Sequence, residues 1–197
     1  MTTQRALLAE QVRRLIEATV RTTAGEDELA RAVERVSSVA DSLDGCGGKS
    51  EHPAGLRVPD ARSLTFDNPV EGVGNPLAPP LTGFSGGEGV VSARVRFGIA
   101  HQGAPGRVHG GWLAAVLDHA VGRAVAGAGW PAMTVSLAVE YHRGTPFDTD
   151  LDVEAAYAGK DGRKVYATAK IRAAGVVTVT ASAVMVAVEG LLGGGGG

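Results

Sequence analysis

The sequence contains one cysteine, few aromatic residues and almost no net charge. A single cysteine, Cys46, excludes an internal disulfide and a cysteine metal cluster, and it is typical of a reducing compartment. Aromatic residues make up 5% of the chain, so the core must be built from Ala, Val, Leu and Ile. A formal net charge of −2 gives no reason to expect nucleic acid as a partner, since such proteins usually carry a basic patch.

Long hydrophobic runs are also missing. The N-terminus lacks the continuous apolar segment of a signal peptide, and no run approaches the roughly 20 apolar residues that cross a bilayer. At 44% apolar and 20% charged residues, the chain is too hydrophobic and too weakly charged to be disordered. We therefore expect a soluble, cytoplasmic, globular protein without membrane insertion.

Glycine, by contrast, is abundant, with 29 residues among 197. No Gly-X-Y period is present, which excludes collagen. Local composition divides the chain into a helical extension (1–43), an irregular connector rich in Gly and Pro (44–80), a main domain (81–188) and a flexible glycine-rich tail (189–197).

The N-terminal extension is amphipathic. Apolar residues recur at spacings of three and four in two runs separated by Gly25, which predicts two helices. We expect these apolar stripes to pack on the main domain or on a sister subunit, and the alternative is a binding arm for another protein. The stripe residues are Leu8, Val12, Leu15, Ile16, Val20, Leu29, Val33, Val36, Val39 and Leu43.

The main domain combines one very apolar helix with several strands. Residues 111–126 are apolar on almost every side, so this helix must be buried on most sides. One strand pattern precedes it and four follow it, which predicts an α+β fold with an antiparallel sheet wrapped around a single central helix. The expected strands are 89–97, 133–141, 151–157, 164–173 and 176–188, with a hairpin turn at 159–162.

A glycine-rich segment leads into the central helix. Gly110 and Gly111 stand at the helix start, where free backbone N–H groups meet the positive end of the helix dipole. Such a terminus can bind an anion or polarise a carbonyl group. Helix capping and tight packing are the structural alternatives.

Asp118 lies two turns into this apolar helix. An isolated buried carboxylate costs several kcal/mol unless it is paired, and the flanking apolar residues offer no partner. Asp118 is therefore a candidate general base or nucleophile for attack on an activated carbonyl. The alternatives are a salt bridge to Arg123 or Arg143, or exposure on a polar stripe with His119.

Together these residues resemble a known signature. His109-Gly110-Gly111 followed by Asp118 is similar to the motif of PaaI-type hot-dog fold acyl-CoA thioesterases, in the 4-hydroxybenzoyl-CoA thioesterase superfamily. The resemblance covers residues 78–188 and leaves out the first 77. A wider set resembles the subgroup that contains the human carboxyl-terminal modulator protein: Gln102, Gly103, Pro105, Gly106, Thr134, Leu137, Tyr141 and Arg143.

The resemblance implies a function in fatty acid metabolism and a role for each matching residue. The Gly110 N–H would polarise the thioester carbonyl, and Asp118 would activate water or attack directly. Thr134 would hold the water from the partner subunit, because the family forms homodimers, often paired into homotetramers, with active sites at the interface. His109 would orient the loop and the thioester end of the substrate.

The expected substrate-binding residues are Gln102, Gly103, Gly111, Arg143, Lys160 and Arg163. Gln102 and Gly103 lie where many relatives have an asparagine that helps to hold the substrate. Arg143, Lys160 and Arg163 could pair with the phosphates of coenzyme A, which Arg and Lys suit, or could be ordinary solvated charges.

We expect no metal, since no histidine pair has ligand spacing, and no cofactor apart from the coenzyme A of the substrate. Two other functions stay open. The N-terminal helices, which a thioesterase domain does not need, would suit a non-catalytic acyl-CoA sensor or scaffold. An acyl-CoA hydratase on the same fold is the third possibility.

Overall fold

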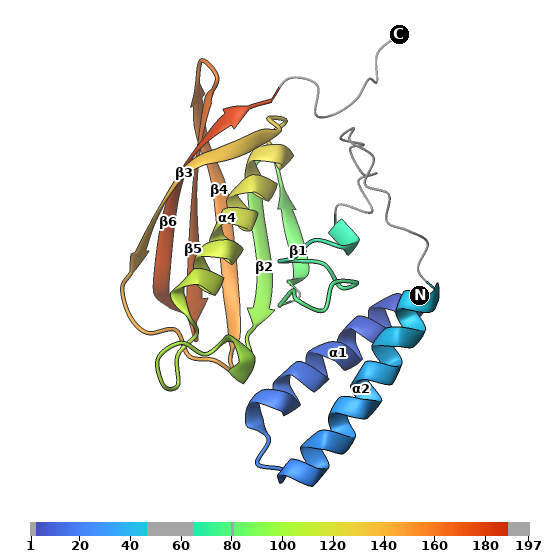
Figure 1. The fold of residues 1–197 in the computed structure, drawn as a ribbon. Coiled ribbons are helices and arrows are strands. Elements are labelled where there is room, and N and C mark those ends of the chain that lie inside the picture. Colours follow the sequence, from blue (N-terminus) through green and yellow to red (C-terminus); the bar gives the residue numbers. More distant parts are fainter. Residues whose placement is uncertain (1–2, 47–64, 80, 189–197) are drawn as a thin grey trace.

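The computed structural model describes residues 3–46, 65–79 and 81–188. It contains a six-stranded antiparallel sheet that curls around one long helix, with a pair of helices before it (Figure 1). The predicted α+β hot-dog architecture is therefore confirmed. The tail at 189–197 and most of the connector lie outside the described residues.

The elements follow one another in a simple order. The sheet order is β1-β2-β4-β5-β6-β3, so β1 and β3 form its two edges. No helix in the described ranges is long and apolar enough to cross a membrane. The elements are α1 (Gln4–Arg21), α2 (Glu26–Cys46), β1 (Thr82–Gly87), β2 (Val90–Arg96), η1 (Ile99–His101), α4 (Gly110–Gly127), β3 (Ala132–Tyr141), β4 (Asp150–Asp161), β5 (Lys164–Ala173) and β6 (Val176–Ala187).

The core lies between the inner face of the sheet and α4. Alternate strand residues point inward, and the register places Ile171 of β5 opposite Val153 of β4 and Val179 of β6. All three side chains are fully buried, as are Val116 and Val121 of α4. Burial of each such side chain contributes about 1.5–3 kcal/mol, which explains why α4 needs its apolar character on several sides.

Two details differ from the sequence expectations. Strand β1 was not predicted, because its sequence Thr-Gly-Phe-Ser-Gly-Gly has little strand character; it exists because it pairs with β2. The β4–β5 turn was also placed too early. Gly159, with φ of +131°, is instead part of β4 and pairs with Tyr166 just after a register shift that follows Tyr157. The turn itself consists of Gly162 and Arg163.

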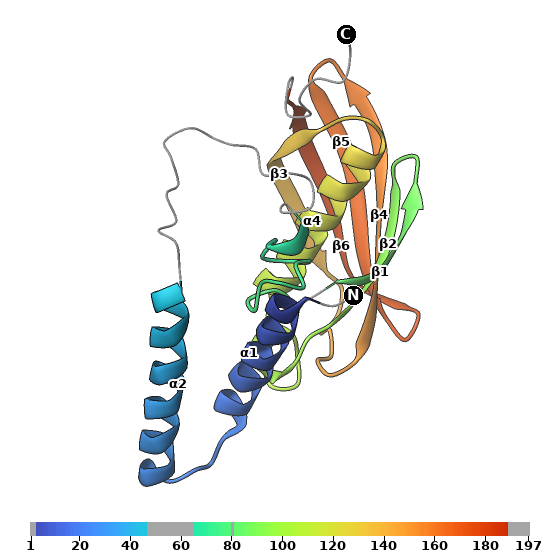
Figure 2. The same ribbon diagram turned by 90° about the vertical axis from the view of Figure 1, so that its right-hand side faces the viewer.

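The two N-terminal helices differ in their packing. Helix α1 docks on the chain's own domain, with Ala6 and Ala9 buried and Arg13 Nη1 donating to the carbonyl oxygen of Asn75 at 2.9 Å. Helix α2 buries none of its residues, and in Figure 2 it lies on the far side of α1 from the sheet. Docking on the main domain is thus confirmed for α1 alone, and the apolar stripe of α2 stays exposed.

Candidate active site

The N-terminus of α4 presents an open backbone donor. His109 caps the helix: its Nδ1 accepts the Gly111 N–H at 3.0 Å, and its carbonyl oxygen accepts the Trp112 N–H at 3.1 Å. The Gly110 N–H has no acceptor within the part of the chain that the structure describes. An N–H that is free at the positive end of a helix can donate to a ligand oxygen.

Tyr141, at the end of β3, holds the Gly110 residue from the other side. Its hydroxyl donates to the carbonyl oxygen of Gly110 at 2.9 Å. A Cβ on Gly110 would lie 3.1 Å from that hydroxyl oxygen, so a larger residue would crowd the contact. The sequence analysis did not predict this contact, because the two residues are 31 positions apart.

The loop before His109 is held by its own contacts. The Gln102 side chain accepts the Gly106 N–H at 3.1 Å, and the Gly103 N–H donates to the carbonyl oxygen of Arg107 at 2.9 Å. A Cβ on Gly103 would lie 2.9 Å from the Cα of His109. Gln102 and Gly103 therefore shape the loop that positions His109.

Asp118 lies about 12 Å from Gly110 along the helix axis, at 1.5 Å per residue. It is half-buried, and its Oδ1 is buried without a hydrogen-bond partner in the described residues. Neither proposed salt bridge forms: Arg123 pairs with Glu71 at 3.5 Å, and Arg143 is exposed. The structure thus leaves an unpaired carboxylate on a helix face whose neighbours one turn away, Ala114 and Gly122, are small.

Glu71 is a buried acidic residue that the sequence did not single out. It comes from the connector and lies 3.2 Å from Nε2 of His119, in addition to its contact with Arg123. His119 is therefore engaged away from Asp118, as the 100° turn per helical residue requires. No group of three or more potential metal ligands occurs within the described ranges.

Helix α1 is linked through Glu17 to the segment that leads into the loop before His109. The Glu17 carboxylate accepts the N–H groups of Ile99 and Ala100 at 2.9 and 3.2 Å, and His101 Nδ1 lies 4.0 Å away. The carbonyl oxygen of His101 in turn accepts the His109 N–H at 2.8 Å. A continuous chain of contacts thus connects the N-terminal extension with the start of α4.

The His101 ring lies edge-on to two aromatic side chains. Its centroid is 5.3 Å from that of Phe97 and 4.9 Å from that of Trp112. Burial lowers the pKa of His101 below the ordinary imidazole value, and the nearby Glu17 carboxylate offsets this only in part. Near neutral pH the ring is therefore uncharged and packs as an aromatic group.

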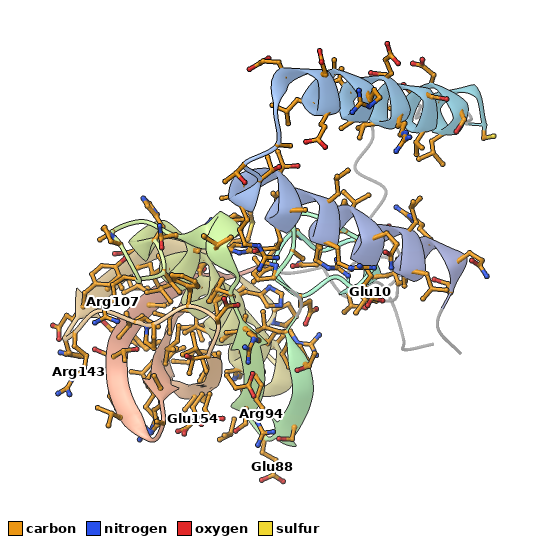
Figure 3. All side chains as sticks on the ribbon, turned by 90° about the horizontal axis from the view of Figure 1, so that it is seen from below. Glu10, Glu88, Arg94, Arg107, Arg143 and Glu154 are labelled. Carbon is orange, nitrogen blue, oxygen red and sulfur yellow. The ribbon has the colours of Figure 1, made fainter. Side chains whose placement is uncertain are left out.

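The remaining predicted residues are divided between the two ends of α4. Thr134 lies seven residues before Tyr141 on β3, roughly 23 Å away along an extended strand. Lys160 is at the same distant end, with its Nζ 4.5 Å from the Trp130 ring, and Arg163 is in the adjoining turn. Figure 3 shows Arg143 beside Arg107, on the side of the domain away from α1. One chain therefore does not bring Thr134, Lys160 and Arg163 to Gly110.

Comparisons with known proteins agree with this fold. The sequence pattern of the thioesterase superfamily matches residues 105–179. The crystal structure of protein RHA08564, a thioesterase superfamily protein, is 33% identical with a TM-score of 0.84, covering 94% of this chain and 92% of that one. The chain therefore belongs to the thioesterase superfamily.

More distant structures share the fold alone. PA5202 from Pseudomonas aeruginosa is 19% identical, with a TM-score of 0.51 over 69% of this chain and 100% of its own. The smu.793 protein from Streptococcus mutans, solved bound to acetyl CoA, is 15% identical, with a TM-score of 0.51 over 54% of this chain and 90% of its own. A search of curated protein sequences finds no significant match.

Proposed function

We propose that the protein hydrolyses an acyl-CoA thioester to the free acid and coenzyme A. The observation that carries this proposal is the unpaired buried oxygen of Asp118 on the helix whose N-terminus presents the free Gly110 N–H. Superfamily membership supports the reaction class. The smu.793 structure with acetyl CoA supports the ligand class.

In this mechanism the thioester oxygen accepts a hydrogen bond from the Gly110 N–H. Negative charge develops on that oxygen during attack, and the helix terminus stabilises it. Asp118 takes a proton from water as the water oxygen bonds to the carbonyl carbon, or its carboxylate attacks that carbon directly. In the water route the C–S bond then breaks and the thiolate of coenzyme A takes up the proton held by Asp118. In the direct route the C–S bond breaks to leave a mixed anhydride of Asp118 and the acyl group. Water then hydrolyses this anhydride, which releases the acid, restores the carboxylate and supplies the proton to the thiolate.

The geometry favours the route through water. The Asp118 Cα–Cβ bond tilts toward the N-terminus of α4, as in any helix, so the carboxylate leans toward Gly110. The two residues are still about two helical turns apart. A water molecule held by the carboxylate extends the reach of Asp118 by one hydrogen bond of about 2.8 Å, which direct attack lacks.

The site is completed by a second copy of the chain in this proposal. Strand β3 is an edge strand with an apolar exposed side, since Met133 and Val135 are 63% and 62% exposed. An edge strand has a row of unpaired N–H and C=O groups that can pair with a strand of another chain. Antiparallel pairing of two β3 strands over residues 132–141 would place the partner's Thr134 opposite Val139, two residues from Tyr141.

Asp118→Asn tests the proposed chemistry. The amide keeps the shape of the side chain but cannot act as a base, so kcat should fall by about 10²–10⁴-fold on acyl-CoA substrates. Thermal stability should not fall, because the change removes an unpaired half-buried charge. Asp41→Asn, on the exposed helix α2, is the matched control and should change neither kcat nor thermal stability. A loss of less than about tenfold (~1.4 kcal/mol) would contradict the role of Asp118.

A further inference from the structure

Helix α1 and the main domain line an open cavity of about 390 Å³. The cavity lies between α1, residues 76–79, the η1 segment and the start of α4. Neither the proposed chemistry nor the β3 edge uses it. Glu17 and Arg13 help to hold α1 in this position.

The cavity has a surplus of positive charge. Four arginines line it, Arg13, Arg14 and Arg21 from α1 and Arg96 from β2, against two carboxylates. Glu17 already accepts two backbone N–H groups, and Arg96 pairs with Asp150 at 3.2 Å.

Arg14 and Arg21 are the arginines that remain available to a ligand. Arg14 donates to the Gln11 side-chain oxygen and Arg21 to the Glu17 carbonyl oxygen. Within the described residues neither guanidinium pairs with a carboxylate. They are seven positions apart, so their Cα atoms are about 10 Å apart on one face of the helix. This spacing suits a ligand that carries more than one phosphate group.

Apolar side chains make up the rest of the wall. Ile16, Leu77 and the half-buried ring of Trp112 line the same space. Trp112 is also only two residues after Gly110, and His101, another lining residue, binds the His109 N–H through its carbonyl oxygen. A ligand in the cavity would thus lie next to the proposed thioester site, with a flat group on the indole ring and phosphates on the arginines.

We propose that this cavity binds the phosphorylated nucleotide end of coenzyme A, the adenosine 3′,5′-bisphosphate and its diphosphate bridge. The proposal rests on the proposed acyl-CoA substrate and makes the N-terminal extension part of the substrate-binding site. It competes with the expectation that Arg143, Lys160 and Arg163 bind the phosphates. Arg143 faces away from α1 (Figure 3), and Lys160 stacks on Trp130 at the far end of α4.

The test compares an acyl-CoA with the acyl-pantetheine of the same acyl group, which has the thioester but no nucleotide. Arg14→Ala/Arg21→Ala should raise KM for acyl-CoA at least tenfold with little change in kcat, and should leave kcat/KM for acyl-pantetheine unchanged. Arg31→Ala/Arg35→Ala on α2 removes the same charge from an exposed helix and should change neither substrate. Arg143→Ala tests the competing expectation that Arg143, and not the cavity arginines, binds the phosphates.

Binding of adenosine 3′,5′-bisphosphate, measured by calorimetry, separates this proposal from the proposed function. Binding that the Arg14/Arg21 double variant loses supports the cavity even if the wild type hydrolyses no acyl-CoA, in which case only the thioesterase proposal fails. An unchanged KM in the double variant, or a KM effect confined to Arg143→Ala, overturns the cavity proposal. Equal affinity for inorganic phosphate would overturn the assignment to a nucleotide.

Discussion

At the scale of single residues, the candidate site relies on backbone groups held in place by side chains. His109 uses its ring to cap Gly111, and this leaves the Gly110 N–H as the free donor. Tyr141 then holds the carbonyl oxygen of the same Gly110 residue. A Cβ at position 110 would lie 3.1–3.2 Å from the Tyr141 ring and hydroxyl, so any other residue there would push this ring aside.

Tyr141→Phe tests this arrangement at the residue scale. Loss of one neutral hydrogen bond to Gly110 should lower kcat by roughly tenfold, since such a bond contributes about 0.5–1.5 kcal/mol. The melting temperature should change little, because Tyr141 is an exposed side chain. Tyr166→Phe on β5 removes the same hydroxyl away from Gly110 and serves as the control. Equal activity of the two variants would argue against a role for Tyr141.

At the scale of elements, α1 acts as a clamp on the segment that precedes the reactive loop. The Glu17 carboxylate accepts the N–H of Ile99, which lies 82 positions later in the sequence. Gly98 is part of this clamp, because a Cβ there would overlap the Glu17 carboxylate. Helix α2 makes no comparable contact among the described residues and buries none of its side chains. The two helices of the extension therefore have different roles in the fold.

Glu17→Ala should release this clamp. Hydrogen bonds to a charged acceptor contribute about 1.5–3 kcal/mol, so the variant should lose stability of that order. Hydrogen exchange of the amides of residues 98–101 should accelerate more than exchange in β4 and β5, which changes only as far as the global stability falls. Glu34→Ala, at an exposed position of α2, should change neither property. Unaltered exchange at 98–101 in Glu17→Ala would show that α1 does not hold this segment.

At the scale of the whole molecule, the predicted site residues belong to two separate regions of one chain. Gly110, His109 and Tyr141 lie where α4 begins, whereas Thr134 and Lys160 lie near its end. A closed two-fold assembly of two chains is the simplest arrangement that brings both regions together. The proposed surface for it is the edge strand β3, whose outer side is exposed and apolar.

Mixing two inactive variants tests this assembly. If Asp118 and Thr134 act across the interface, a heterodimer of Asp118→Asn and Thr134→Ala chains contains one fully intact site. Co-refolded equal amounts should then recover about a quarter of wild-type activity, because half of the dimers are mixed and each has one working site. Each variant refolded alone is the control. Absence of recovery in a verified heterodimer would place the two residues in the same subunit's site.

Much of the fold follows from local sequence patterns, and part of the site does not. The apolar helix and five of the six strands were predictable because burial imposes a regular period on the chain. Strand β1 was missed because its glycines carry no such pattern, and it forms only by pairing with β2. The contacts of Glu17 and Glu71 could not be predicted either, since their partners Ile99 and Arg123 are 82 and 52 positions away.

The sequence by itself determined the class of fold, the buried helix and the residues that lead into it, because these depend on periodicity and on glycine at a helix start. Only the tertiary structure decided that, within the described residues, Asp118 Oδ1 has no hydrogen-bond partner and the Gly110 N–H has no acceptor, and that α1 lines an arginine-rich cavity. The physical reason is that pairing and enclosure are properties of segments distant in sequence. They are set by how these segments pack together, and no local pattern records them.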